Sequence, residues 1–484
     1  MNRIVPILWI AFMLGFSAKA QQKWSFQQCV EHAMKSNLSV SRAEIQAKLS
    51  NIASRQNKWG LLPNLNLSSS GAFNSGLNQD PTTFTRVTES YLSAGMQLQS
   101  SADIFQFFSK RLQYQSSRID YMAAQADVSK IRYDIGLSTA NAFLQALLAK
   151  QQAAVASLQV EQTLAQLNNT RKLVDAGTLP MLNLSQIEAQ WALDSSNLIS
   201  AQGNATLSLL SLKAWMNIDA AEPFDIEEPP VESIPVETLA DLQPEFVYDL
   251  ALKNQPQQKS NELRLMSAQL RNKSAKAARL PSLAAFGSLG SNYLSFTKRP
   301  IYNRIITGYQ PTGLIVDAAG VQYDVQSPVF TNGNIAGYFK PNTVGKQLTD
   351  NFRKTIGLSL SVPIFNGSSA KLNVERSQLD LQSATLQQTQ DNLKLKQDIY
   401  QAYQAAGIAL QKFNASKKSV SVSEQTYEYA SKRFNVGMLS TFDLITSQNN
   451  LLRARLEFVT AQFDYVFKMK VLEYYKGLGL KLTK

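Results

Sequence analysis

The sequence has one cysteine, Cys29, and one histidine, His32, among its 484 residues. A single cysteine excludes an intramolecular disulfide, so packing has to hold the fold together. The two residues stand three positions apart on a predicted helix, but two ligands do not make a metal site. Nucleophile-elbow, P-loop and dinucleotide-binding motifs are missing from any strand–helix context. We therefore predict no metal, no cofactor and no catalytic residues, and an enzyme is the least favoured class.

Long apolar runs are also missing. After the N-terminus, no stretch approaches the roughly 18 unbroken apolar residues of a membrane-spanning helix. The N-terminus combines Arg3, an apolar core from Ile4 to Phe16, and the small-residue site Ala18-Lys19-Ala20. This pattern predicts a secretory signal peptide over residues 1–20. The mature chain is then exported without a helical anchor, and any membrane crossing has to use strands.

Acidic residues are fewer than basic ones, which gives a formal net charge of +12. A basic excess can indicate binding to nucleic acid or to an anionic surface. Here the lysines and arginines are scattered among Gln, Ser and Asn, with no dense basic run interleaved with aromatic residues. We therefore predict that the chain does not bind nucleic acid.

The sequence contains a degenerate internal repeat. Leu62-Pro63-Asn64-Leu65 matches Leu280-Pro281-Ser282-Leu283 at an offset of 218, and later matches have an offset of 260. The later pairs join Lys172, Gly177, Leu179 and Leu184 to Lys432, Gly437, Leu439 and Leu444. We predict a duplication with repeats at residues 21–221 and 245–484, joined by a Pro- and acid-rich linker at 222–244. The change of offset places an insertion at about residues 294–351.

Each half has the same predicted elements. The first half has helices at about 26–60, 107–175 and 183–216, with alternating strands at 64–75 and 91–100. The second half has helices at about 245–280, 369–435 and 441–475, with strands at 282–296 and 354–365. Apolar residues recur every seven positions in both long helices, which is typical of coiled coils. The positions are Leu112, Ile119, Ala126, Tyr133, Ala140 and Leu147, then Leu372, Leu379, Leu386, Leu393 and Tyr400.

The element lengths indicate a mixed α/β membrane protein that is mainly α. Helices of about 70 residues span roughly 105 Å, which no globular domain requires. Two short helices end to end match one long helix, so the helices can form an antiparallel coiled-coil barrel. Four strands leave open edges, which lipid does not tolerate, and a four-stranded barrel is too narrow for a channel. Three chains pooling their strands would close a twelve-stranded transmembrane β-barrel.

Two segments carry a resemblance to a known family. Residues 434–444, Phe-Asn-Val-Gly-Met-Leu-Ser-Thr-Phe-Asp-Leu, resemble the second turn motif of the TolC family of outer-membrane efflux proteins. Residues 357–367 resemble the last strand of that family where it enters the long helix. The resemblance implies a homotrimer with a periplasmic helical tunnel, in the outer membrane of a Gram-negative bacterium. It also implies a periplasmic adaptor (membrane fusion) protein and an inner-membrane RND or ABC transporter as partners.

The resemblance assigns expected sites at the two glycine turns. The adaptor is expected to bind beside Gly177, Leu179, Gly437, Leu439 and Ser440. The glycines have a sufficient alternative role, because glycine ends a helix with a positive φ at no steric cost. A closed entrance is expected at Asp443, Phe434, Thr446 and Asn183. Asp443 matches the first of two aspartates that the family often has here, and Thr446 stands at the second position. Asn183 is the place in the first half that corresponds to Asp443, and Phe434 lacks the hydroxyl of the usual tyrosine. Asp443 could instead serve only as a helix N-terminal residue.

The expected function is a passive export duct of a tripartite efflux or type I secretion system, for small molecules or proteins. The alternative is a periplasmic coiled-coil scaffold without a pore. The aromatic-rich insertion at 294–351 is expected to be an extracellular loop, either solvated or folded over the mouth of the channel.

Overall fold

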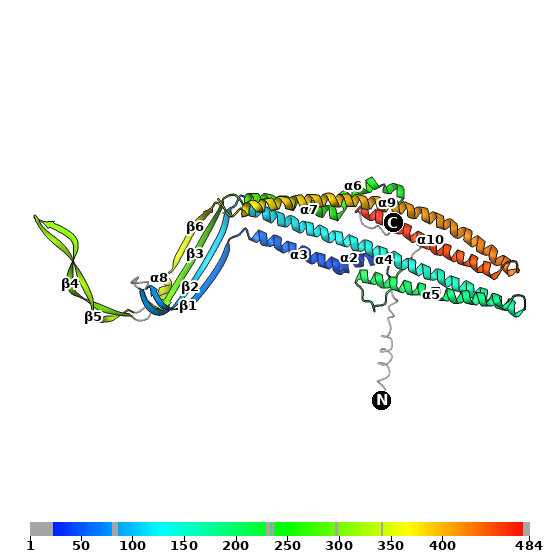
Figure 1. The fold of residues 1–484 in the computed structure, drawn as a ribbon, viewed down its shortest axis with the longest axis horizontal. Helices are drawn as coiled ribbons and strands as arrows, with labels where there is room; N and C mark the ends of the chain where they lie inside the picture. Colours follow the sequence, from blue (N-terminus) through cyan, green and yellow to red (C-terminus); the bar gives the residue numbers. More distant parts are fainter. Residues whose placement is uncertain are drawn as a thin grey trace, which may run out of the picture. The chain divides into compact units, whose positions relative to one another are not determined.

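A computed structural model describes residues 23–79, 86–228, 234, 237–295, 299–339 and 342–477 (Figure 1). The predicted signal peptide, residues 1–20, lies outside this part of the chain. The described residues divide into two compact units. The helical unit consists of the described residues up to Arg55, of residues 112–273, and of the described residues from Asn373 onward. The strand unit consists of the described residues within 56–111 and 274–372. In the described part of the chain, no helix has the length and apolar character needed to cross a bilayer.

Helices make up most of the chain, so the prediction of a mainly α protein with a few strands is confirmed. Outside the insertion, the described helices are α2 (Phe26–Ser36), α3 (Leu38–Trp59), α4 (Ser109–Asp175), α5 (Met181–Met216), the 3₁₀ helix η2 (Leu239–Leu242), α6 (Pro244–Asn254), α7 (Pro256–Ala277), α9 (Ser369–Asn435) and α10 (Thr441–Tyr475). Both long helices, α4 and α9, have 67 residues and are about 100 Å long at 1.5 Å per residue.

The first helix of each half is broken where the sequence predicted continuity, so that prediction was wrong in this detail. Asn37 separates α2 from α3, and Gln255 separates α6 from α7, both with extended backbone. Asn37 Oδ1 accepts a hydrogen bond from Ser39 N (2.8 Å), which replaces a helical bond. At Gln255 the following Pro256 disfavours a helical conformation. Local side-chain and proline effects therefore outweigh helix propensity at both points.

The turns at the end of each long helix have the same geometry. Gly177 and Gly437 both have a φ of 72°. Gly177 N bonds to Val174 O (2.9 Å), and Thr178 N bonds to Leu173 O (2.9 Å). The same pair of bonds ends α9, from Gly437 N to Phe434 O and from Met438 N to Arg433 O. Each glycine thus occupies the left-handed position that closes a helix.

The main core lies around the middle of α4, where α2, α5 and α10 pack on it. Its fully buried members include Cys29, Phe143, Leu147, Leu212 and Met216. The described start of the predicted linker packs against the helices, because Ile226 is fully buried and forms a bridge with Trp24. Leu242 at its other end is fully buried in a second cluster with Ile399 and Met469.

The four predicted strands form one antiparallel sheet in the order β1 (Asn64–Gln79), β2 (Arg86–Phe105), β3 (Ser282–Ser295) and β6 (Arg353–Ser361). The strands β1 and β2 extend beyond the predicted ranges, because they continue to pair where the alternation of side chains weakens. Within the described residues, β1 and β6 are the edges of this sheet.

The sheet has a mainly apolar and a mainly polar face, with Phe286 next to Gly357 on the polar face. Directly paired residues share a face, so Leu67, Leu98 and Leu289 form an apolar row, next to the polar row of Asn66, Gln99 and Ser288. The apolar face also carries Leu65, Phe73, Leu92, Ala94, Met96, Leu283, Ala285, Ile356, Leu358 and Leu360. The polar face also carries Ser68, Ser70, Asn74, Ser93, Gln97, Asn292, Thr355 and Ser359.

The insertion contains regular structure that the sequence analysis did not predict. It forms a long hairpin of β4 (Arg299–Ala318) and β5 (Val321–Phe339), followed by helix α8 (Val344–Asp350). Ala319 and Gly320 both have positive φ, as a tight two-residue hairpin turn requires. Gln347 of α8 donates to Leu294 O and accepts from Leu294 N, both at 3.1 Å. This side chain pairs with β3 beyond Gly290, where β6 no longer does.

Candidate functional site

The first candidate site is formed by the two glycine turns. Gly177, Gly437 and Ser440 are exposed, while Leu179 and Leu439 are half-buried. The turns lie near each other, because Asn169 Nδ2 of α4 donates to Asn435 Oδ1 of α9 (3.4 Å). Exposed apolar side chains surround them, namely Met181, Leu182, Val436, Met438 and Phe442. An exposed apolar patch of this kind suits a protein partner.

The structure gives Ser440 and Asp443 a local role. Ser440 caps α10, since its Oγ accepts from Asp443 N (3.1 Å) and donates to the Asp443 carboxylate (2.7 Å). A carboxylate at this position also interacts favourably with the positive end of the helix dipole. Asp443 remains exposed, so its charge can still act on ions nearby. Capping and ion attraction are compatible roles.

The other expected gate residues are placed differently from one another. Thr446 is exposed and donates to Phe442 O (2.8 Å), and Asn183 is half-buried. Phe434 is only 4% exposed, so its ring packs inside its own chain. A buried phenyl ring stabilises the end of α9, and a direct role in the gate stays a prediction for this residue.

Sequence reasoning missed a buried polar cluster between the helices. The Asp194 carboxylate of α5 accepts from Thr163 Oγ1 (2.6 Å), Gln159 Nε2 (3.2 Å) and Gln190 Nε2 (2.8 Å). Gln448 of α10 donates to Thr163 Oγ1 (2.8 Å). The cluster connects α4, α5 and α10 through neutral donors. Glutamine and threonine in a helix are usually surface residues, so the sequence does not show that these side chains are buried, and only the packing of the helices does.

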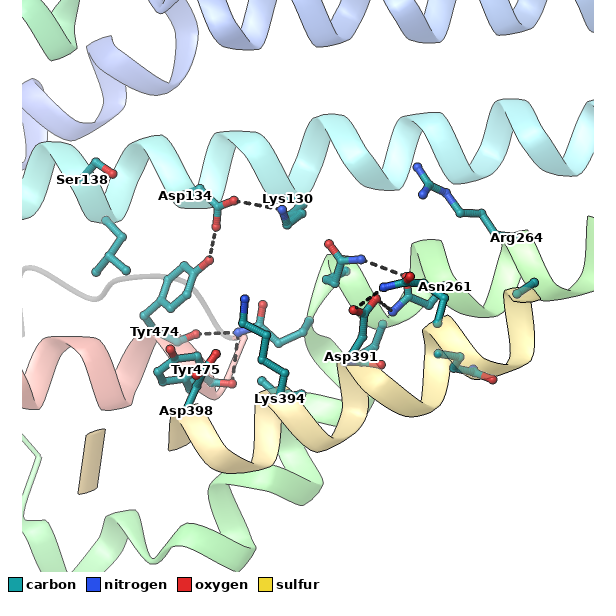
Figure 2. Close-up of a pocket in the computed structure, with 18 residues that line it drawn as sticks. Lys130, Asp134, Ser138, Asn261, Arg264, Asp391, Lys394, Asp398, Tyr474 and Tyr475 are labelled. Carbon is teal, nitrogen blue, oxygen red and sulfur yellow. Dashed lines mark hydrogen bonds and ion pairs between the residues drawn. The ribbon is translucent and has the colours of Figure 1, made fainter. Parts of the chain in front are cut away.

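A groove of about 830 Å³ runs between α4, α7 and α9 beside the end of α10 (Figure 2). Tyr474 Oη donates to Asp134 Oδ1 (2.5 Å), and Asn261 Nδ2 donates to Asp391 Oδ2 (2.8 Å). Burial raises the pKa of Tyr475 to about 12, and the negative charges of Asp398 and Asp134 contribute to the same increase. The tyrosines therefore stay protonated. No three His, Cys, Asp or Glu side chains among the described residues are arranged to hold a metal ion.

Two helices carry apolar stripes that their own chain leaves exposed. On α9 the stripe recurs every seven residues at Leu372, Leu379, Leu386 and Leu393. On α3 it recurs every seven residues at Leu38, Ile45, Ile52 and Trp59. The corresponding face of α4 is half-buried, and α7 packs beside it through Arg271–Asp120 and Arg264–Asp127 bonds of 2.6 Å. Seven-residue apolar stripes without a partner helix are unfavourable in water.

Comparison with known families settles the class of protein. The family model described as outer membrane efflux protein matches residues 30–217 and 340–468, which is more than half of the chain. The chain belongs to the outer membrane efflux protein family. The matched ranges leave out residues 218–339, which contain β3 and the β4–β5 hairpin.

Similar proteins cover nearly the whole chain. Outer membrane protein TolC of Escherichia coli K12 is 22% identical over 469 residues, which cover 96% of this chain and 84% of TolC. The crystal structure of CusC has a TM-score of 0.73 at 14% identity and covers 94% of this chain and 92% of its own. The Campylobacter jejuni CmeC outer membrane channel has a TM-score of 0.72 at 17% identity, covering 95% of this chain and 87% of its own.

Membership in the outer membrane efflux protein family decides between the alternatives. This member is an outer-membrane efflux channel of a Gram-negative bacterium, and not a pore-free periplasmic scaffold. Proteins of this family are channels rather than enzymes.

Proposed function

We propose that three copies of this chain form a closed export duct, in which the strands line a twelve-stranded barrel and the helices line a tunnel. The single observation that carries this proposal is the two-faced sheet with open edges. Most of the large apolar side chains on its apolar face are exposed, for example Leu67, Ile356 and Leu358. Tilted strands of about 9–11 residues span the hydrocarbon core; the apolar face suits this core and the polar face suits a water-filled lumen.

The edge strands favour pooling between chains. Within the described residues, β1 and β6 each pair on one side only. Unpaired backbone groups are not tolerated in lipid, so each edge requires a strand from another chain. Pairing of β6 with β1 of the next copy repeats the sheet around a closed ring. Four strands from each of three copies give the twelve-stranded barrel.

The helices favour the same assembly. An offset of 260 residues relates α4 to α9, and an offset of 218 residues relates α3 to α7, as the proposed duplication requires. Leu263 is buried on α7, whereas Ile45, its counterpart on α3, is exposed. We infer that α9 packs on α3 of the next copy as α4 packs on α7 within one chain. Each copy then contributes two equivalent repeats, residues 21–221 and 245–484, to one ring of helices.

Substitution within the α9 stripe tests the trimer. Leu386→Lys places a charge in the proposed interface, so we expect the detergent-solubilised trimer to dissociate to monomers on a native gel. The matched control is Thr385→Lys, an exposed position rotated by about 100° around the same helix. Retention of the trimer by both variants, or its loss in both, would contradict the assigned interface.

The two glycine turns are the proposed contact with the transport machinery. Exposed apolar residues around Gly177 and Gly437 supply a surface for a periplasmic adaptor, and an inner-membrane RND or ABC transporter supplies the energy. We expect a photoreactive residue at Leu439 to crosslink to a periplasmic adaptor in intact cells. The same residue at Thr206, which is exposed in the second half of α5, serves as the control. Equal capture at both positions would remove the turns from the docking surface.

A further inference from the structure

Among the described side chains, the polar face of the sheet carries one basic residue, Arg353. Arg353 lies at the start of β6 and pairs with Gly290, which itself pairs with Gln97. These three residues and Ser68 form one row across the sheet. The neighbouring rows are formed by hydroxyl and amide side chains, such as Gln99, Ser288 and Thr355.

The surroundings of Arg353 leave its charge uncompensated in the row. Gly290, the partner of Arg353, has no side chain. The Gln97 side chain borders the space that this leaves, since a Cβ built on Gly290 would lie 3.6 Å from Gln97 Cγ. The other charged residue among the described side chains of this face is Asp103, which pairs with Lys110. Asp103 stands six residues along β2 from Gln97, or about 20 Å at 3.3 Å per residue. That distance exceeds the Debye length at physiological salt.

We propose that Arg353 forms an anion-selective ring inside the barrel, with one guanidinium from each of three chains. This inference rests on the proposed function, in which the polar face lines the lumen. A guanidinium offers forked donors to carboxylate, phosphate and sulfate groups, and the neutral neighbours Gln97 and Thr355 add further hydrogen bonds. The barrel therefore favours cargo with anionic groups, and it does so more strongly at low ionic strength.

The next residue supplies a matched control. Lys354 carries the same charge, but it pairs with Leu289 on the apolar face, and its Nζ lies 5.4 Å from the centroid of the Phe352 ring. Arg353→Gln and Lys354→Gln therefore remove equal charge from opposite faces of β6. Arg353→Lys keeps the positive charge and loses the forked donors.

The local potential can be measured at Gln97. We would introduce Gln97→Cys into the full-length protein in membranes and compare its labelling rates with anionic and cationic methanethiosulfonates of similar size. Each rate is normalised to that of a free thiol. The native thiol of Cys29 should give no background labelling, because it is fully buried. Burial, together with the smaller effect of the Glu227 charge, also raises the pKa of this thiol to about 12. Met96→Cys, on the apolar face, reports separately on which face meets water.

We expect the anionic reagent to react about threefold faster or more at low salt, with the preference lost at 1 M salt. Arg353→Gln should abolish the preference, while Arg353→Lys and Lys354→Gln should retain it. Equal rates in the parent, or a preference unaffected by Arg353→Gln, would overturn the anion ring. Faster labelling at Met96→Cys than at Gln97→Cys would instead overturn the proposed orientation of the barrel, and with it the proposed function.

Discussion

Asn37 and Gln255 hold their helix breaks in place by the same type of contact. Asn37 Nδ2 donates to Trp215 O near the end of α5 (2.9 Å). Gln255 Nε2 donates to Tyr474 O (3.0 Å) and Tyr475 O (3.1 Å) at the end of α10. Each side chain therefore joins the start of one half of the chain to the end of a returning helix.

Substitution of these two residues should destabilise the helical unit. Asn37→Ala and Gln255→Ala each remove a side-chain donor from partly or fully buried carbonyl groups, which costs about 1–3 kcal/mol. The two losses should add, because the residues share no partner. Thermal unfolding followed by circular dichroism measures the effect, and Gln27→Ala, at an exposed bond to Glu31, is the control. Unchanged melting in both variants would show that the contacts do not hold the breaks.

The glycine turns should resist substitution for a conformational reason. At Gly177 and Gly437 a Cβ would meet nothing within 4 Å, so only the φ of 72° opposes alanine. We expect each Gly→Ala change to cost about 1–2 kcal/mol. Gly203 is equally unobstructed but lies within α5, where alanine should stabilise by about 0.5–1 kcal/mol. Opposite signs in the measured melting temperatures are the expected result, and equal signs would contradict it.

Stability should fall at alkaline pH. Burial raises the pKa of Cys29 from 9.0 to about 12, and the pKa of Tyr475 is raised from 10.0 to about 12. Both groups hold their protons more tightly in the folded chain. Their contribution is therefore complete below about pH 9 and is lost progressively up to about pH 12. Melting temperatures across this range test the window, and Cys29→Ala should delay the fall to about pH 10. A fall that begins at the same pH in this variant would exclude the thiol.

Charge at the turn should affect ion preference if Asp443 acts at the entrance. Asp443→Asn keeps a capping side chain but removes the charge at the entrance, so we expect the ratio of cation to anion permeability to fall in single-channel recordings. Asn183→Asp adds a carboxylate at the corresponding place in the first half and should increase the preference for cations. An unchanged cation preference in Asp443→Asn would leave this residue with its capping role alone.

The β4–β5 hairpin offers a test of the channel mouth. Replacing residues 300–340 by a short Gly/Ser linker removes nearly all of β4 and β5 and keeps α8 on β3. If the hairpin folds over the mouth, single-channel conductance should rise. The same conductance as in the parent channel would identify the hairpin as a solvated extracellular segment.

The positions of the main elements could be predicted from residues near one another in the chain. Alternation of Leu65 and Leu67 with Asn64 and Asn66 indicates a strand, because side chains on a strand project to opposite faces. Gly177 marks the end of α4 because few other residues adopt a left-handed conformation without strain. These signals are local, so no tertiary structure is needed to read them.

The sequence alone determined the order of the main helices and strands outside the insertion, the two turns and the family resemblance. Only the tertiary structure decided which apolar positions are filled within the chain. Ile119 of α4 and Leu379 of α9 occupy equivalent positions in the two repeats, yet Ile119 is half-buried and Leu379 is exposed. Beside Ile119, α7 packs against α4 through the bond from Arg271 to Asp120. Burial depends on which helix lies alongside, and that depends on contacts between residues far apart in the chain. The same reason explains the buried Phe434.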